Sequence, residues 1–194
     1  MKNRTTIECV NPVSNSLCFG AHWGAISHND LFGETNEFVD LDGGCIAFDK
    51  KDRYLFMVYF GNLEEKGIKH SGDDLVGDEW IDNEADNETI CINLSELEPK
   101  VKKLFFVLNS YKGHKLTSIP FIRLRVYQGD FNQVDKVLAQ FDVENNSKFS
   151  GATSVIMGRL CRKPDGWKFV AIGEPTRDRH IRDIITTIKK RFLN

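Results

Sequence analysis

Short, strongly apolar runs separated by turn residues constrain the fold of this 194-residue chain more than any other feature. Ten runs are apolar throughout or alternate between apolar and polar side chains, as β-strands do. They cover residues 5–10, 16–23, 37–48, 54–60, 88–94, 102–111, 120–128, 138–143, 153–162 and 167–173. Turn residues stand between them, for example Pro164-Asp165-Gly166, which is typical of a hairpin. This pattern predicts an all-β fold, a β-sandwich or a β-barrel.

Helical periodicity is strong at one place only, near the C-terminus. From Asp178 to Phe192, apolar residues recur on one side and basic residues cover the other, which predicts an amphipathic helix. A single helical turn is also expected at Asn93–Glu98. The chain is 41% hydrophobic and shows no internal repeat or linker, so we expect residues 1–194 to form a single domain.

A local block of negative charge lies between Gly72 and Glu88, where eight side chains are acidic and none is Lys or Arg. The whole chain carries 28 acidic and 26 basic side chains, so the remainder of the chain is net basic. Within the block, acidic residues stand two apart from Asp82 to Glu88, and in an extended chain such residues point the same way. If these carboxylates lie close together, they must share protons or bind a cation. If they do not, the segment is a solvated acidic loop.

A second acidic pair, Asp40 and Asp42, precedes the glycine turn Gly43-Gly44 and would lie on one face of a strand end. Loops cluster at the ends of a sandwich, so this pair and the acidic block can meet in space. Calcium takes six to eight oxygen ligands, and no His or Cys lies within Gly72–Glu88. We therefore expect a calcium site that lacks EF-hand spacing; the alternative for the pair is an ordinary strand–turn junction.

The same residues carry a family resemblance. HSGDDLVGD and EADNETICINL, together with FVDLDGGCIAFD, LCFGAHW, LNSYKG and WKFVAIG, resemble in order the motifs of the TerD family of tellurium-resistance and stress proteins. The Cys after DLDGG and the basic tail RDRHIRDI are closest to its TerZ branch. The resemblance implies a calcium-binding β-sandwich of two mainly antiparallel sheets, with short helices and a C-terminal helix. The sequence departs from the family by the inserted residues 79–83, by Ala85 in place of Gly, and by Asn87 in place of an acid.

The acidic segments and the resemblance together give the candidate metal ligands: Asp40, Asp42, Asp73, Asp74, Asp78, Asp82, Glu84, Asp86 and Glu88. The resemblance also implies a non-enzymatic, cytoplasmic stress-response protein that binds Ca²⁺ and acts as a scaffold or sensor with protein partners. The sequence contains no GxSxG, P-loop or Rossmann glycine motif, in keeping with this expectation.

Two other functions use the same carboxylates. A metal-dependent hydrolase, for example a phosphodiesterase or nuclease, would place Mg²⁺ or Mn²⁺ there beside a cleft. A calcium-dependent adaptor would dock a protein or a membrane surface through Trp80 and Ile81 in the acidic loop. Nucleic acid is not an expected partner, since the acidic block opposes it.

The five cysteines (Cys9, Cys18, Cys45, Cys91 and Cys161) are scattered and form no CxxC pair, so reduced thiols in a cytosolic protein are expected. No signal peptide or membrane-spanning run is visible. Arg123 is expected either to pair with a loop acid or to form a surface ion pair. Asn109 is expected either to offer a neutral calcium ligand or to cap a turn.

Overall fold

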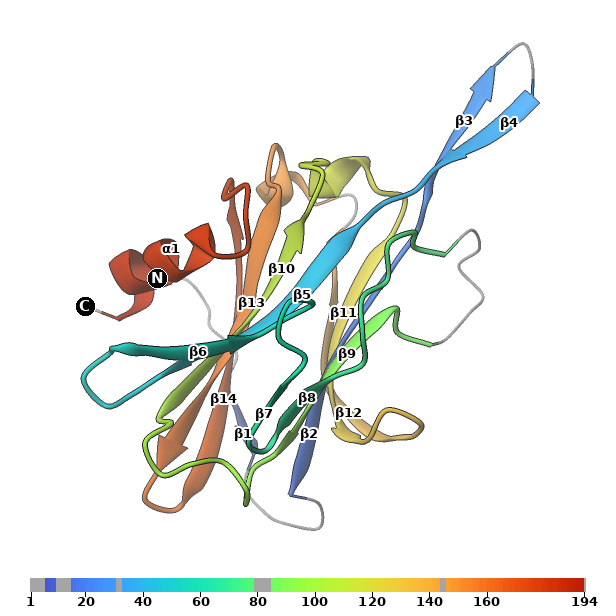
Figure 1. The fold of residues 1–194 in the computed structure, drawn as a ribbon. Helices are drawn as coiled ribbons and strands as arrows, with labels where there is room; N and C mark the ends of the chain where they lie inside the picture. Colours follow the sequence, from blue (N-terminus) through green and yellow to red (C-terminus); the bar gives the residue numbers. More distant parts are fainter. Residues whose placement is uncertain (1–5, 10–14, 31–32, 79–84, 144–145, 194) are drawn as a thin grey trace.

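Two six-stranded antiparallel sheets pack face to face in the computed structural model, which describes residues 6–9, 15–30, 33–78, 85–143 and 146–193 (Figure 1). The first sheet has the order β1 (Thr6–Cys9), β14 (Gly166–Thr176), β13 (Ser154–Lys163), β10 (Lys103–Ser110), β5 (Leu41–Phe48) and β6 (Tyr54–Val58). The second has the order β12 (Val134–Asp142), β11 (Ile122–Gly129), β2 (Ser16–Trp23), β9 (Glu88–Asn93), β8 (Ile68–His70) and β7 (Glu64–Glu65). The predicted sandwich is therefore confirmed.

Alternation along the strands builds the core between the sheets. On β2, Leu17 and Phe19 point inward and meet the first-sheet residues Leu104 and Phe106. On β11, Ile122, Leu124 and Val126 are buried, whereas Arg123 and Arg125 lie on the outer face, as the sequence pattern predicts. The outer face of the second sheet therefore carries polar side chains that can contribute to a site.

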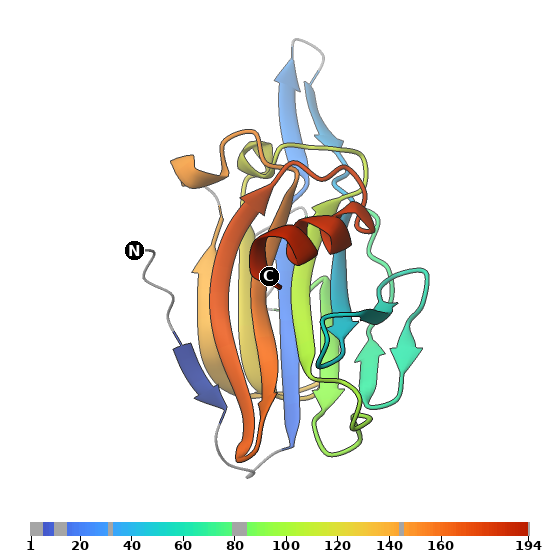
Figure 2. The same ribbon diagram turned by 90° about the vertical axis from the view of Figure 1, so that its left-hand side faces the viewer.

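The helix α1 (Asp183–Phe192) lies across the outer face of the first sheet, as Figure 2 shows. Ile184 and Ile188 pack there against Phe48 and Phe105. The helix ends at Phe192, as the sequence predicts, but it begins at Asp183, five residues after the predicted start at Asp178. The residues before it form the connection from β14. Two short 3₁₀ helices, η1 (Leu116–Ser118) and η2 (Ser147–Phe149), lie in connections, and the expected helical turn at 93–98 is a non-helical turn.

Each of the ten predicted runs overlaps a strand, but the sequence patterns miss four short strands among the described residues. Strands β3 (Ile26–Asp30) and β4 (Gly33–Glu37) form a separate hairpin that projects from the sandwich (Figure 1), and β7 and β8 complete the second sheet. The β3–β4 segments are polar and show no apolar alternation, so periodicity gave no signal. Glu37 ties the hairpin to the body through His114, at 2.8 Å, and also contacts His28 at 3.0 Å.

The expectation of unpaired thiols is wrong for Cys18 and Cys91, which form a disulfide. The two cysteines are 73 residues apart, but β2 and β9 are adjacent and place them directly opposite each other. Spacing along the sequence cannot reveal such a pair, because the pairing depends on the register of two distant strands. Cys45 is a free thiol, as expected, and it is fully buried, which raises its pKa.

Candidate functional site: an acidic cluster at one end of the sandwich

Two segments distant in sequence bring three carboxylates together at one end of the sandwich. Asp40 and Asp42 stand at the start of β5, and Asp73 stands in the loop that follows β8. One oxygen atom of each carboxylate lies within 4.8 Å of the other two. Asp40 and Asp42 are buried, whereas Asp73 is exposed, so the cluster opens to solvent on one side.

The two buried carboxylates lack partners for part of their hydrogen-bonding capacity. Asp40 Oδ1 and Asp42 Oδ2 receive no hydrogen bond from any residue in the described part of the chain. Burial, followed by the charges of Asp40, Glu88 and Asp73, raises the pKa of Asp42 from 3.8 to about 8. Burial and the charge of Asp73 also raise the pKa of Asp40. Without a cation, the cluster therefore retains a proton near neutral pH.

Glu88, at the start of β9, links the two acidic segments from inside the sandwich. Its Oε2 accepts a hydrogen bond from the Gly43 amide at 2.6 Å, and its Oε1 accepts one from the Asp74 amide at 3.3 Å. His70 Nε2 lies 3.4 Å from Glu88 Oε2. Burial raises the pKa of Glu88, and His70 opposes the rise. Glu88 thus holds the backbone of both segments in position.

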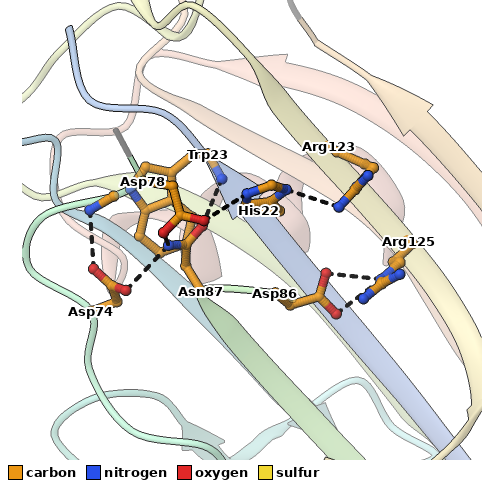
Figure 3. Close-up of polar contacts among 9 residues, drawn as sticks. His22, Trp23, Asp74, Asp78, Asp86, Asn87, Arg123 and Arg125 are labelled. Atoms are coloured by element: carbon orange, nitrogen blue, oxygen red, sulfur yellow. Dashed lines mark hydrogen bonds and ion pairs between the residues drawn. The ribbon is translucent and has the colours of Figure 1, made fainter. Parts of the chain in front are cut away.

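Asn87 organises a second group of acids, shown in Figure 3. Its Nδ2 donates to Asp74 Oδ2 at 3.2 Å and to Asp78 Oδ1 at 3.0 Å, and its Oδ1 accepts from the Trp23 amide at 2.8 Å. Asp74 Oδ1 also accepts hydrogen bonds from the amides of Val76 and Gly77. The protein itself therefore supplies partners for Asp74 and Asp78.

A chain of contacts continues from Asp78 to the outer face of β11 (Figure 3). Asp78 Oδ2 lies 2.9 Å from His22 Nε2, and His22 Nδ1 lies 2.8 Å from Arg123 Nη2. Burial lowers the pKa of His22. A neutral imidazole with its proton on Nε2 fits both contacts, since Nδ1 can then accept from Arg123.

Asp86 forms a nearly buried ion pair with Arg125. The Arg125 Nε lies 2.8 Å from Asp86 Oδ1 and 3.0 Å from Oδ2, and the two side chains are 13% and 2% exposed. Gly20 provides the space for this carboxylate, because a Cβ atom at Gly20 would lie 1.8 Å from Asp86 Oδ2. Arg125 therefore neutralises the Asp86 charge, and Asp86 does not join the cluster of Asp40, Asp42 and Asp73.

Comparison with protein families decides the chain's relationship. The model of the TerD domain matches residues 3–187. The chain belongs to the TerD family. The chain is 29% identical to the tellurium resistance protein TerZ of Serratia marcescens, over 97% of this chain and 95% of that protein. It is 30% identical to the stress response protein SCP2 of Bacillus subtilis (strain 168), over 89% of this chain and 88% of that protein.

A solved structure shows the same fold. A homologue of the telluride resistance protein TerD from Streptomyces coelicolor A3(2) superposes with a TM-score of 0.65 at 13% identity, covering 84% of this chain and 90% of that one. The predicted membership in the TerD family, near TerZ, is confirmed. The names of these relatives refer to tellurium or telluride resistance and to stress response, so they give no support to the metal-dependent hydrolase considered above. Among the described residues, no helix has both the length and the apolar character that crossing a bilayer requires.

The structure distributes the candidate ligands of this TerD protein over three groups. Asp40, Asp42 and Asp73 converge, with Glu88 behind them. Asp74 and Asp78 bind Asn87, and Asp86 binds Arg125. Asp82 and Glu84 lie outside the described residues, as do Trp80 and Ile81 of the adaptor hypothesis.

Several polar residues of the TerD site were missed or only partly anticipated from the sequence. Arg125 and His22 were not among the candidates, although FIRLRV places Arg123 and Arg125 on one face. Arg123 contacts His22, which in turn contacts Asp78, and so it reaches the acidic loop through an imidazole. Asn109 donates to Ser154 Oγ at 2.7 Å and to the Asp178 carbonyl at 3.2 Å, which is a structural role at the connection before α1.

Proposed function

We propose that this chain is a calcium-binding, non-catalytic TerD protein whose ion is held between β5 and the loop that follows β8. Asp40, Asp42 and Asp73 would hold the ion. The observation that carries the proposal is the placement of Asp40 Oδ1 and Asp42 Oδ2, which are buried and receive no hydrogen bond from the described residues. A buried carboxylate oxygen without a donor is costly, and a cation removes that cost.

The donor set fits calcium in three respects. All three groups are carboxylates, which suit a hard cation. Calcium accepts irregular coordination geometry, so ligands from one buried segment and one exposed segment can bind the same ion. The exposed Asp73 leaves the cluster accessible to an ion and to the water molecules that complete its coordination. By contrast, Asp74, Asp78 and Asp86 already have protein partners and are not proposed as ligands.

Bound calcium would supply the positive charge that neutralises the cluster. Glu88 keeps the Gly43 and Asp74 amides in place, so the two segments are already positioned before an ion arrives. An ion that binds the folded state alone stabilises that state, because its binding free energy adds to the free energy of unfolding. The calcium level would thereby set the stability of this end of the sandwich.

A calcium-dependent end face suits a scaffold or sensor for protein partners in a cytoplasmic stress response. The support for this role is the membership in the TerD family, together with relatives named for stress response and tellurium resistance. The partners would recognise the loops of the calcium-bound state, in which the carboxylate charges are neutralised. They would not recognise the metal-free state, in which the carboxylates repel one another and are partly protonated.

The proposal predicts that stabilisation by calcium increases with pH. In the metal-free protein the pKa of Asp42 is about 8, above its ordinary value of 3.8. The folded protein therefore holds a proton that the unfolded chain releases, and this contribution to stability is lost as pH rises from about 4 to 8. Calcium must displace that proton, so its effect should be larger at pH 8 than at pH 5. Thermal melts with calcium, magnesium or chelator at pH 5–8 measure this dependence.

Magnesium serves as the control ion in these melts, and it should raise the melting temperature much less, because it demands near-octahedral geometry and dehydrates reluctantly. Superimposable melts with calcium and with chelator at pH 8 would contradict the proposal.

A further inference from the structure

A row of three side chains crosses the outer face of the second sheet. Cys18 on β2 lies opposite Cys91 on β9, and Lys69 on β8 lies opposite Cys91 from the other side. Paired residues of antiparallel strands place their side chains on the same face of the sheet. Leu17 and Ile92, adjacent to these cysteines in sequence, point into the core instead. The Cys18–Cys91 disulfide therefore lies on the outer face, next to a lysine.

The two sulfur atoms of this disulfide have different surroundings. Cys18 is fully buried, and its Sγ lies 3.5 Å from the Gly129 carbonyl oxygen. Cys91 is partly exposed and lines a surface hollow of about 340 Å³. A thiolate attacks a disulfide sulfur from the side opposite the leaving sulfur. Cys91 lies between Cys18 on β2 and Lys69 on β8, so the strand on its far side from Cys18 is β8. Cys91 is thus the more accessible cysteine of the pair, and Cys18 is sheltered.

The lining of the hollow combines charges of both signs. Lys69 contributes an ammonium group, which pairs with Glu64 at 3.3 Å. Glu96 adds a second carboxylate, and Phe131 adds an exposed aromatic ring. A small thiol that carries both a carboxylate and an ammonium group would find a partner for each charge beside the Cys91 sulfur.

We propose that Cys91 is a site of thiol–disulfide exchange with small zwitterionic thiols. The incoming thiolate bonds to Cys91 Sγ, the Cys18–Cys91 bond breaks, and the Cys18 sulfur leaves and takes a proton from water. The Gly129 carbonyl, already at 3.5 Å, accepts the hydrogen bond of the new Cys18 thiol. A second small thiol then attacks the small-thiol sulfur of the mixed disulfide and releases Cys91 as a thiolate. The positive charge of Lys69 favours this thiolate. The protein gains two electrons and two protons, and two small thiols become one small disulfide.

Glutathione is a suitable probe, and the first experiment needs no substitution. Folded wild-type protein is incubated with millimolar reduced glutathione, quenched with acid, alkylated and mapped by peptide mass spectrometry. The Cys18–Cys91 bond should open, and the trapped mixed disulfide should be on Cys91 and not on Cys18. A disulfide that opens only after denaturant is added would overturn the proposal, and so would a mixed disulfide found first on Cys18.

Single-cysteine variants test the asymmetry. With oxidised glutathione, Cys91 in the Cys18→Ser variant should be modified roughly tenfold or more faster than Cys18 in the Cys91→Ser variant, because buried thiols are inert. Circular dichroism confirms that both variants are folded before rates are compared. Equal rates in the two folded variants would contradict the assignment of Cys91 as the attacked sulfur.

The Lys69→Gln variant tests the class of thiol. It should slow exchange with glutathione more than exchange with 2-mercaptoethanol, which carries no charged groups besides its thiolate. The matched control, Lys136→Gln, changes an exposed lysine on β12 and should leave both rates unchanged. Equal slowing of both thiols by Lys69→Gln, or no slowing of either, would overturn the zwitterionic class.

Discussion

Replacing Asp42 with Asn should raise the melting temperature of the metal-free protein at pH 8 and abolish most of its further rise on addition of calcium. Asp42 is 2% exposed, and burial, followed by the charges of Asp40, Glu88 and Asp73, raises its pKa to about 8, so its ionised form is destabilising at pH 8. Relief of about 1–3 kcal/mol is expected on removing a buried, poorly paired charge. In a chain of this size, 1 kcal/mol corresponds to about 2–4 °C. Differential scanning calorimetry with chelator and with calcium measures both effects.

The matched control is Asp165→Asn, which changes an exposed acid in the β13–β14 hairpin. It should change neither the metal-free melting temperature nor the calcium effect. The opposite signs of the two Asp42→Asn effects make the test specific, because a merely disruptive substitution would lower the metal-free melting temperature. A variant that is less stable without metal yet keeps the full calcium effect would contradict the assignment of Asp42 as a ligand.

Replacing Gly20 with Ala should destabilise the protein by about 3–5 kcal/mol, the usual cost of breaking a buried ion pair. A Cβ atom at position 20 would lie 1.8 Å from Asp86 Oδ2, so the carboxylate must move away from Arg125. Both charged groups would then be buried without good partners, and their desolvation would no longer be offset. Urea denaturation of wild type and variant measures the difference in the free energy of unfolding.

A double-mutant cycle provides the control for this second result. In an Asp86→Ala background there is no carboxylate for the new methyl group to displace, so Gly20→Ala should then cost much less. An equal cost in both backgrounds would show that Gly20 is required for another reason, such as strand packing. The cycle therefore tests whether the Asp86–Arg125 ion pair requires a residue without a Cβ atom at position 20.

Strand alternation, as along β11, predicted a β-sandwich or a β-barrel because it reflects which side chains face the core, and the resemblance to the TerD family implied the sandwich. The sequence missed the β3–β4 hairpin because ISHND and GETNE have no apolar face, and their pairing depends on backbone hydrogen bonds between adjacent polar strands. It missed the Cys18–Cys91 bond because that contact depends on the register of β2 against β9.

The candidate site was predictable in part for the same reason. Strand periodicity placed Asp40 and Asp42 together, and the two carboxylates do meet. It could not show which loop acid joins them, since loop side chains also bind local backbone and distant cations. The Asp74 carboxylate accepts hydrogen bonds from backbone amides of its own turn, and Asp86 forms an ion pair with Arg125, 39 residues away. Each acid's partner depends on tertiary structure that charge spacing does not encode.

Native mass spectrometry combined with calcium titration calorimetry tests the central claim most directly. The wild-type protein should bind calcium, with measurable heat at millimolar concentrations or below. The Asp42→Asn variant should lose that binding, whereas Asp165→Asn should keep it. A wild-type protein that binds no calcium even at millimolar concentrations would contradict the account, because Asp40, Asp42 and Asp73 would then be neutralised by protons alone.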